Sequence, residues 1–204
     1  MDFNDITNRL NRTLTSLNAR FDNDIRKNTK VELIETDGGI GTRTTFGDSD
    51  ENTNLNAIMI ILHNLANIKD NLIKTLITKG KTEKQAKKIV EDEINSSLHL
   101  QVLIDLVNQE KHGYPLTKFI RSNKNPLIKN PAQSLSLGDG REGSVTEINI
   151  AQDGHLIIHG DPPKIILTAD IYDDNNVLLF NLNALVDTCY SKWELLAKTY
   201  DCIQ

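Results

Sequence analysis

One short segment combines polar residues that could do chemistry with the spacing of a helix. Gln101, Asp105, Asn108 and His112 follow one another at intervals of four, three and four residues, so they share one helical face. His112 stands at the predicted end of this helix, where an imidazole can reach solvent. These residue types permit general acid and base catalysis on a phosphodiester by His112, assisted by Asn108 and by Lys111, whose charge would stabilise the phosphate.

The same face also supports a purely structural interpretation. On the preceding predicted helix, Lys69 lies within an apolar stripe and Asp70 stands beside it. A charge that faces the core needs a partner, because an unpaired buried charge is strongly destabilising. We therefore predict that Lys69 pairs with Asp105, within a polar network of Lys69, Asp70, Gln101 and Asp105 that sets the register of two helices. The basic residues at the helix end would then only complement the helix dipole.

Apolar spacing predicts the helices that must position these side chains. Residues 2–26, 55–78 and 82–112 each carry apolar side chains at helical intervals, and a last helix follows Asn181. The link between the second and third helices is so short that they must run antiparallel as a long helical hairpin. The positions predicted to be buried are Leu62, Leu65, Leu72, Leu100, Leu103, Ile104, Val107 and Trp193.

Local capping signals support these helix boundaries. Gly80 is suited to a left-handed cap that ends the second helix. Thr82 and Gln85 have the spacing of a capping box that begins the third helix. Asn181 is a favourable N-cap for the last helix.

The remaining sequence predicts a small antiparallel β-meander at about residues 145–180. Alternating segments are joined there by an Asp153-Gly154 turn and by the polar run DDNN. KVELIE, near residue 30, predicts an additional short strand. Residues 36–54 and 131–144 are predicted to be flexible loops because they are rich in Gly, Asn, Asp and Ser. Together these elements predict an α+β fold in a single domain of residues 1–204, with helical parts at about 1–112 and 181–204.

Charge and composition narrow the classes of partner. The chain of 204 residues has a net charge of −5, yet residues 69–129 contain twelve Lys and Arg against seven Asp and Glu, a net +5. This distribution permits weak, salt-dependent binding of RNA, and it is also typical of a solvated helical surface. The polar N-terminus predicts no secretory signal and no membrane association, and two cysteines without disulfide spacing fit the cytoplasm. We predict no cofactor, because no phosphate-binding or dinucleotide motif occurs, and no metal, because the His and Cys residues lack ligand spacing.

The helical segments resemble a group of uncharacterised bacterial proteins. LANIKDNLIK, INSSLHLQ and DLVNQEKH are similar to the L-K-D and D-L-x-N-x-x-K-H helix pair of that group, and the late strands leading to VDTCYSKWELL match its layout. The motif residues are Asp105, Leu106, Asn108, Lys111 and His112. The resemblance covers Leu55 to His112 and Ile165 to Leu196.

More distantly, the hairpin resembles HEPN domains (higher eukaryote and prokaryote nucleotide-binding), which occur in RNases, toxins and nucleotide-binding proteins of bacterial defence. Active members carry the motif R-x4-6-H, whereas the residues seven to four positions before His112 include no arginine and are Asp105, Leu106, Val107 and Asn108. Only Asn108 and His112 correspond to the motif. The resemblance therefore implies a HEPN-like fold that lacks the arginine of active members.

Two functions of different class follow from this sequence. The first is a non-enzymatic cytoplasmic interaction protein, acting as a homo-oligomer or with a protein partner. The second is a metal-independent ribonuclease that uses His112 with Asn108 and Lys111. The surroundings of His112 distinguish the two, because an enzyme needs this side chain in an open cleft.

Overall fold

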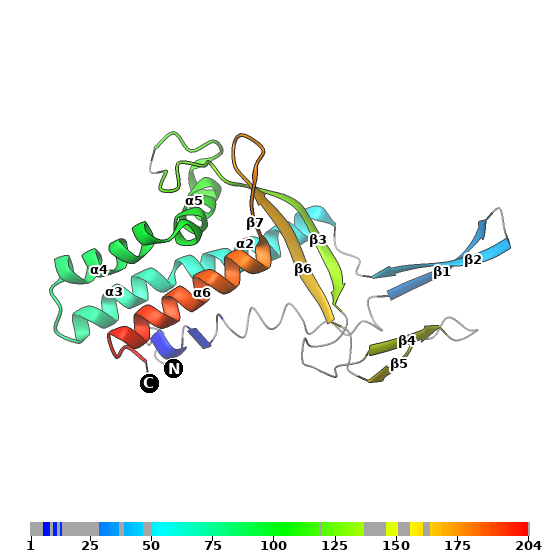
Figure 1. The fold of residues 1–204 in the computed structure, drawn as a ribbon, viewed down its shortest axis with the longest axis horizontal. Helices are drawn as coiled ribbons and strands as arrows, with labels where there is room; N and C mark the ends of the chain where they lie inside the picture. The colour runs from blue at the N-terminus through cyan, green and yellow to red at the C-terminus, as the bar shows by residue number, and fades with distance from the viewer. Residues whose placement is uncertain are drawn as a thin grey trace.

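The computed structural model combines five helices with small antiparallel sheets in the described part of the chain, which is the predicted α+β class (Figure 1). The described residues are 6–8, 10, 11, 13, 29–36, 39–46, 50–118, 120–136, 146–150, 156–160 and 164–203. The helices are α2 (Glu51–Ala66), α3 (Ile68–Thr78), α4 (Glu83–Ser96), α5 (Leu98–His112) and α6 (Leu182–Thr199). The strands are β1 (Thr29–Thr36), β2 (Gly39–Phe46), β3 (Leu127–Ser136), β4 (Thr146–Ile150), β5 (Leu156–Gly160), β6 (Lys164–Tyr172) and β7 (Leu178–Asn181).

Each of the two long helices predicted for residues 55–78 and 82–112 is divided into two. Asn67 separates α2 from α3, and Ser97 separates α4 from α5. Ser97 has extended backbone angles, and its hydroxyl accepts a hydrogen bond from the N–H of Leu100 at 3.5 Å. The prediction of one continuous helix to His112 was therefore wrong, because Ser97 acts as an N-cap inside the apolar pattern.

The capping signals read from the sequence are confirmed. Thr82 and Gln85 form a reciprocal capping box at the start of α4, and Gly80 has a φ of 90° in the link before it. The side chain of Asn181 accepts a hydrogen bond from the N–H of Ala184 at 2.8 Å at the start of α6.

The helices enclose one apolar core between α2, α3, α4, α5 and α6. All eight predicted core positions are buried, and Trp193 of α6 is among the largest side chains without solvent exposure. Ile6 and Leu10, from the described helical residues near the N-terminus, join the same core. The rest of the helix predicted for residues 2–26 lies outside the described residues.

A three-stranded antiparallel sheet in the order β3-β6-β7 stands at the end of the helical layer (Figure 1). On β6, buried Leu167, Ala169 and Ile171 alternate with half-buried side chains, and α6 contacts this strand. The strand β3 was missed in the sequence, and the loop predicted for residues 131–144 is wrong up to Ser136. The predicted pairing of β6 with β7 across the run DDNN is confirmed. The single continuous meander is wrong, because the other edge of β6 pairs with β3 and not with β5.

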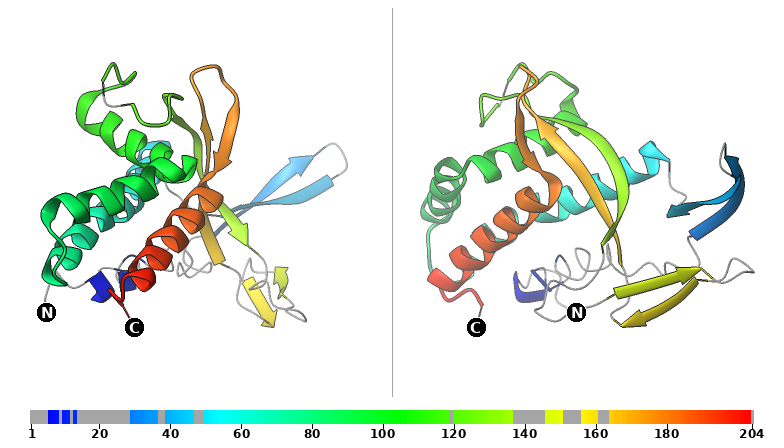
Figure 2. Two further views of the ribbon diagram at one scale, coloured as in Figure 1. Left: turned by 60° about the vertical axis from the view of Figure 1, so that its left-hand side comes forward. Right: turned by 45° about the vertical axis from the view of Figure 1, so that its right-hand side comes forward.

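Two further hairpins project beyond this sheet, away from the helices (Figure 2). β4 pairs with β5, as the alternating pattern predicted. β1 pairs with β2, so the loop predicted for residues 36–54 contains a strand. The described helices include none that is long and apolar enough to cross a membrane.

Candidate functional site

Asp105, the first residue of the polar helix motif, is a fully buried carboxylate on α5. Its oxygens accept hydrogen bonds from the main-chain N–H of Arg121 at 2.8 and 3.1 Å and from the N–H of Ser122 at 2.8 Å. The Ser122 hydroxyl donates a further bond at 2.6 Å. Hydrogen bonds to an ionised acceptor are roughly twice as strong as neutral ones, so this carboxylate anchors the segment after α5.

The anchored segment also contacts α4 and the turn between β6 and β7. The Arg121 guanidinium donates to both carboxylate oxygens of Glu91 on α4, at 2.6 and 3.1 Å. The Nζ atom of Lys124 lies 3.7 Å from a carboxylate oxygen of Asp173. The main-chain carbonyl of Lys124 accepts a hydrogen bond from the N–H of Asp174 at 3.0 Å. Residues 121–124 therefore connect α4, α5 and the sheet, and we call them the linking segment.

The predicted polar network of Lys69, Asp70, Gln101 and Asp105 is not formed. Gln101 donates instead to the main-chain carbonyl of Asn95 at 2.8 Å, across the junction of α4 and α5. Lys69 is half-buried and Asp70 is exposed, and within the part of the chain that the structure describes neither is bonded to Asp105. The predicted pairing of Lys69 with Asp105 is wrong, because this carboxylate accepts its hydrogen bonds from main-chain N–H groups of the linking segment.

The residues of the predicted acid and base site lie at the end of α5. His112 and Lys111 are exposed, Asn108 is half-buried, and the Tyr114 side chain is 49% exposed. Gly113, with a φ of 85°, ends the helix directly after His112. The imidazole therefore reaches solvent, as predicted. The guanidinium of Arg121 is directed to Glu91 on α4.

Three charged or aromatic contacts that the sequence did not indicate join different elements of the fold. The Nζ atom of Lys192 on α6 lies 3.4 Å from the carboxylate oxygen Oε1 of Glu93 on α4. His99 of α5 stacks on Phe180 of β7, with ring centroids 3.9 Å apart. Burial, and secondarily the charge of Lys192, lowers the pKa of His99. No local pattern could have identified these pairs, because the partners lie on different elements.

The third of these contacts joins α2 to α5, where His63 pairs with Glu110 through Nε2. Both side chains are partly exposed, and exposed ion pairs contribute little to stability. The described residues contain no group of three or more His, Cys, Asp or Glu side chains that could hold a metal ion.

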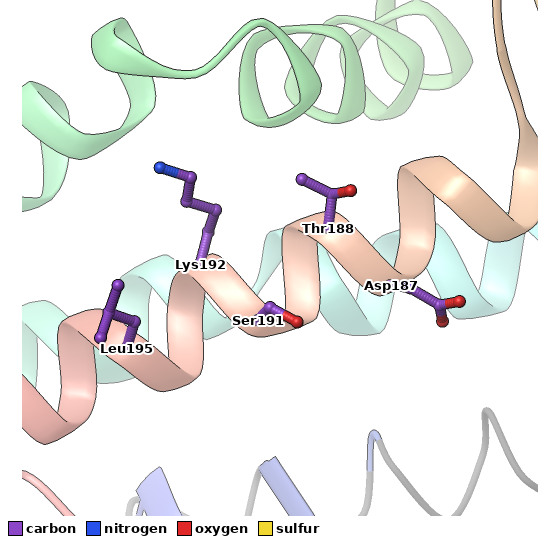
Figure 3. A pocket seen from close by; sticks show the side chains of 5 residues that line it. All are labelled: Asp187, Thr188, Ser191, Lys192 and Leu195. Atoms are coloured by element: carbon purple, nitrogen blue, oxygen red, sulfur yellow. The ribbon is translucent and has the colours of Figure 1, made fainter.

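A shallow depression of about 340 Å³ lies on α6 and is lined by Asp187, Thr188, Ser191, Lys192 and Leu195 (Figure 3). Thr188 and Lys192 point toward α4 and α5, whereas Asp187 and Ser191 point away from them. The depression is wide open and none of the residues predicted for catalysis lines it. It is therefore suited to surface contact more than to enclosing a small molecule.

The chain was compared with protein families, curated proteins and solved structures. No family model, no curated protein and no solved structure matches it.

Proposed function

We propose that this chain is a non-enzymatic cytoplasmic interaction protein built on a HEPN-like helical hairpin, acting as a homo-oligomer or with a protein partner. The observation that carries this proposal is the bonding of Asp105. Among the described residues, the side-chain hydrogen bonds of Asp105 all go to the linking segment, so the acidic residue of the polar motif stabilises the fold.

The distribution of the other polar residues supports the same conclusion. A general base needs a third group that orients it and a stabiliser for the charge that develops on the substrate. The guanidinium of Arg121 is bound to Glu91, and the carboxylate of Asp105 is buried beneath the linking segment. Neither group is directed at the imidazole of His112.

The experiment that tests this function combines isolation of partners with an assay for catalysis. Tagged protein purified from its native host should retain a stoichiometric protein partner or migrate as an oligomer in size-exclusion chromatography. The same preparation should leave single-stranded RNA intact. Cleavage of RNA by the wild type and its loss in His112→Ala would overturn the proposal.

A metal-independent ribonuclease is the second candidate, and the exposure of His112 beside Lys111 favours it. In this function His112 acts as general acid or base, Lys111 stabilises the phosphate and Asn108 assists in positioning. RNA cleavage should then continue in EDTA and fall strongly in His112→Ala, with a smaller loss in Lys111→Ala. The exposed Lys118→Ala serves as a matched control, because it removes one positive charge from the segment that follows.

RNA binding without cleavage is compatible with the first function. The basic residues between Lys69 and Lys129 would bind the phosphate backbone weakly, and the affinity would fall steeply with salt. A titration of single-stranded RNA at low and physiological salt measures this dependence.

A further inference from the structure

We infer that the outward face of α6 binds a second copy of this chain, with the two α6 helices packed antiparallel about a two-fold axis. The inference rests on the proposed function as an interaction protein and specifies one surface and its partner. The face comprises Ala184, Asp187, Ser191, Leu195 and Lys198, which we call the α6 stripe.

The α6 stripe is a continuous exposed helical surface. Its members are spaced three, four, four and three residues apart, so they lie on one side of the helix. All five are exposed, and Leu195 exposes 61% of its surface. The opposite side of α6 packs in the core through Leu185, Cys189, Trp193 and Leu196.

The shape of the α6 stripe permits a close approach by another helix. Ser191 and Ala184 are small, and the shallow depression adjoins the protruding Leu195 (Figure 3). Helix axes approach to about 8–10 Å when small side chains stand at the contact. A two-fold axis that passes between Ser191 and Leu195 would place Leu195 of each copy over Ser191 and the depression of the other.

The charges on the α6 stripe match a second copy in the antiparallel orientation. Asp187 lies toward its N-terminal end and Lys198 toward its C-terminal end, about 16 Å apart along the helix axis at about 1.5 Å per residue. A two-fold axis between them brings Asp187 of each copy near Lys198 of the other, which forms two opposite-charge contacts. A parallel pairing would instead bring like charges together.

The current partners of these charges leave them free to make such contacts. The Nζ atom of Lys198 lies 3.1 Å from a carboxylate oxygen of Glu194, one helical turn earlier, and both side chains are substantially exposed. Exposed pairs of this spacing contribute only about 0.3–0.5 kcal/mol, so the lysine can reorient at little cost. In the described part of the chain, Asp187 has no ion-pair partner.

The size of the contact indicates how tight the dimer is. A single helical stripe buries much less than the roughly 1,600 Å² of a standard protein interface. We therefore expect a reversible dimer with a dissociation constant in the micromolar range, on the order of 10 μM.

The test is sedimentation equilibrium of the full chain and its charge-reversal variants. Asp187→Lys and Lys198→Asp should each weaken dimerisation about tenfold or more, because each places like charges in contact. The double variant should regain most of the affinity, because the two charges are exchanged. Asp70→Lys makes the same chemical change at an exposed site on α3 and should have no effect.

A second pair of variants tests the apolar contact independently of charge. Leu195→Asp should abolish the dimer, whereas Ile60→Asp, at a side chain 62% exposed on α2, should leave it unchanged. A wild type that stays monomeric at about 100 μM, or a double reversal no tighter than its single variants, would overturn the inference. A monomeric wild type that still retains a protein partner refutes only the dimer, whereas RNA cleavage by an intact dimer refutes only the proposed function.

Discussion

The buried carboxylate of Asp105 accepts a 2.6 Å hydrogen bond from the hydroxyl of Ser122, which is also buried. The same carboxylate binds the main-chain N–H groups of Arg121 and Ser122. One side chain of α5 therefore fixes the backbone of the linking segment, and Arg121 and Lys124 extend that link to α4 and the sheet.

Removal of this carboxylate should destabilise the protein strongly. Asp105→Ala leaves buried main-chain donors without an acceptor, so we expect a loss of about 3–5 kcal/mol in the free energy of unfolding. Asp105→Asn keeps one acceptor oxygen and should lose less, and Ser122→Ala should lose about 1–2 kcal/mol. Urea denaturation measures these differences, with the exposed Asp70→Asn as the control. A loss below about 1 kcal/mol for Asp105→Ala would contradict the assigned role.

Substitution of the cap between α4 and α5 should have a moderate effect. Ser97→Ala removes the side-chain acceptor of the first turn of α5, and we expect a loss of about 1 kcal/mol. The neighbouring Ser96→Ala is the matched control, because Ser96 is exposed and its hydroxyl donates to the carbonyl of Glu93 within α4. Equal thermal stabilities for the two variants would mean that Ser97 does not cap α5.

Mild acid should weaken the fold through His99. Its pKa is lowered below the ordinary 6.5 in the folded chain, chiefly by burial against Phe180 and secondarily by Lys192. Between the folded pKa and 6.5 the unfolded chain binds more protons, so stability is complete above pH 6.5 and falls as the pH drops through this window. His99→Gln should show a shallower pH dependence in denaturation titrations than the wild type. Parallel curves for wild type and His99→Gln would exclude this contribution.

The two thiols should react slowly in the native state. Cys189 and Cys202 are both free and buried, and burial raises both pKa values. The thiolate is the reactive form, so labelling by a thiol reagent near neutral pH should be slow and should accelerate when urea unfolds the chain. Cys189→Ala and Cys202→Ala, labelled separately, assign the two rates, and Cys189 should be the slower. Rapid native labelling of Cys189 would show that α6 opens readily.

The sequence by itself determined those features that depend on neighbours a few residues apart. The capping box of Thr82 and Gln85, the cap at Asn181 and the core positions on α5 and α6 follow from helical spacing. Pairing of β4 with β5 follows likewise from alternation around a short turn. Such signals are local, because side-chain faces repeat every three to four residues in a helix and alternate every two residues in a strand.

Only the tertiary structure decided which distant groups meet. Strand β3 contains Pro131 and a bulge, so its alternation is irregular, and its partner β6 begins 28 residues after β3 ends. Asp105 is bound by main-chain N–H groups, which every residue except proline possesses and which leave no trace in residue type. The sequence could show that a buried carboxylate needs donors, but the packing of the linking segment against α5 decided which donors it received.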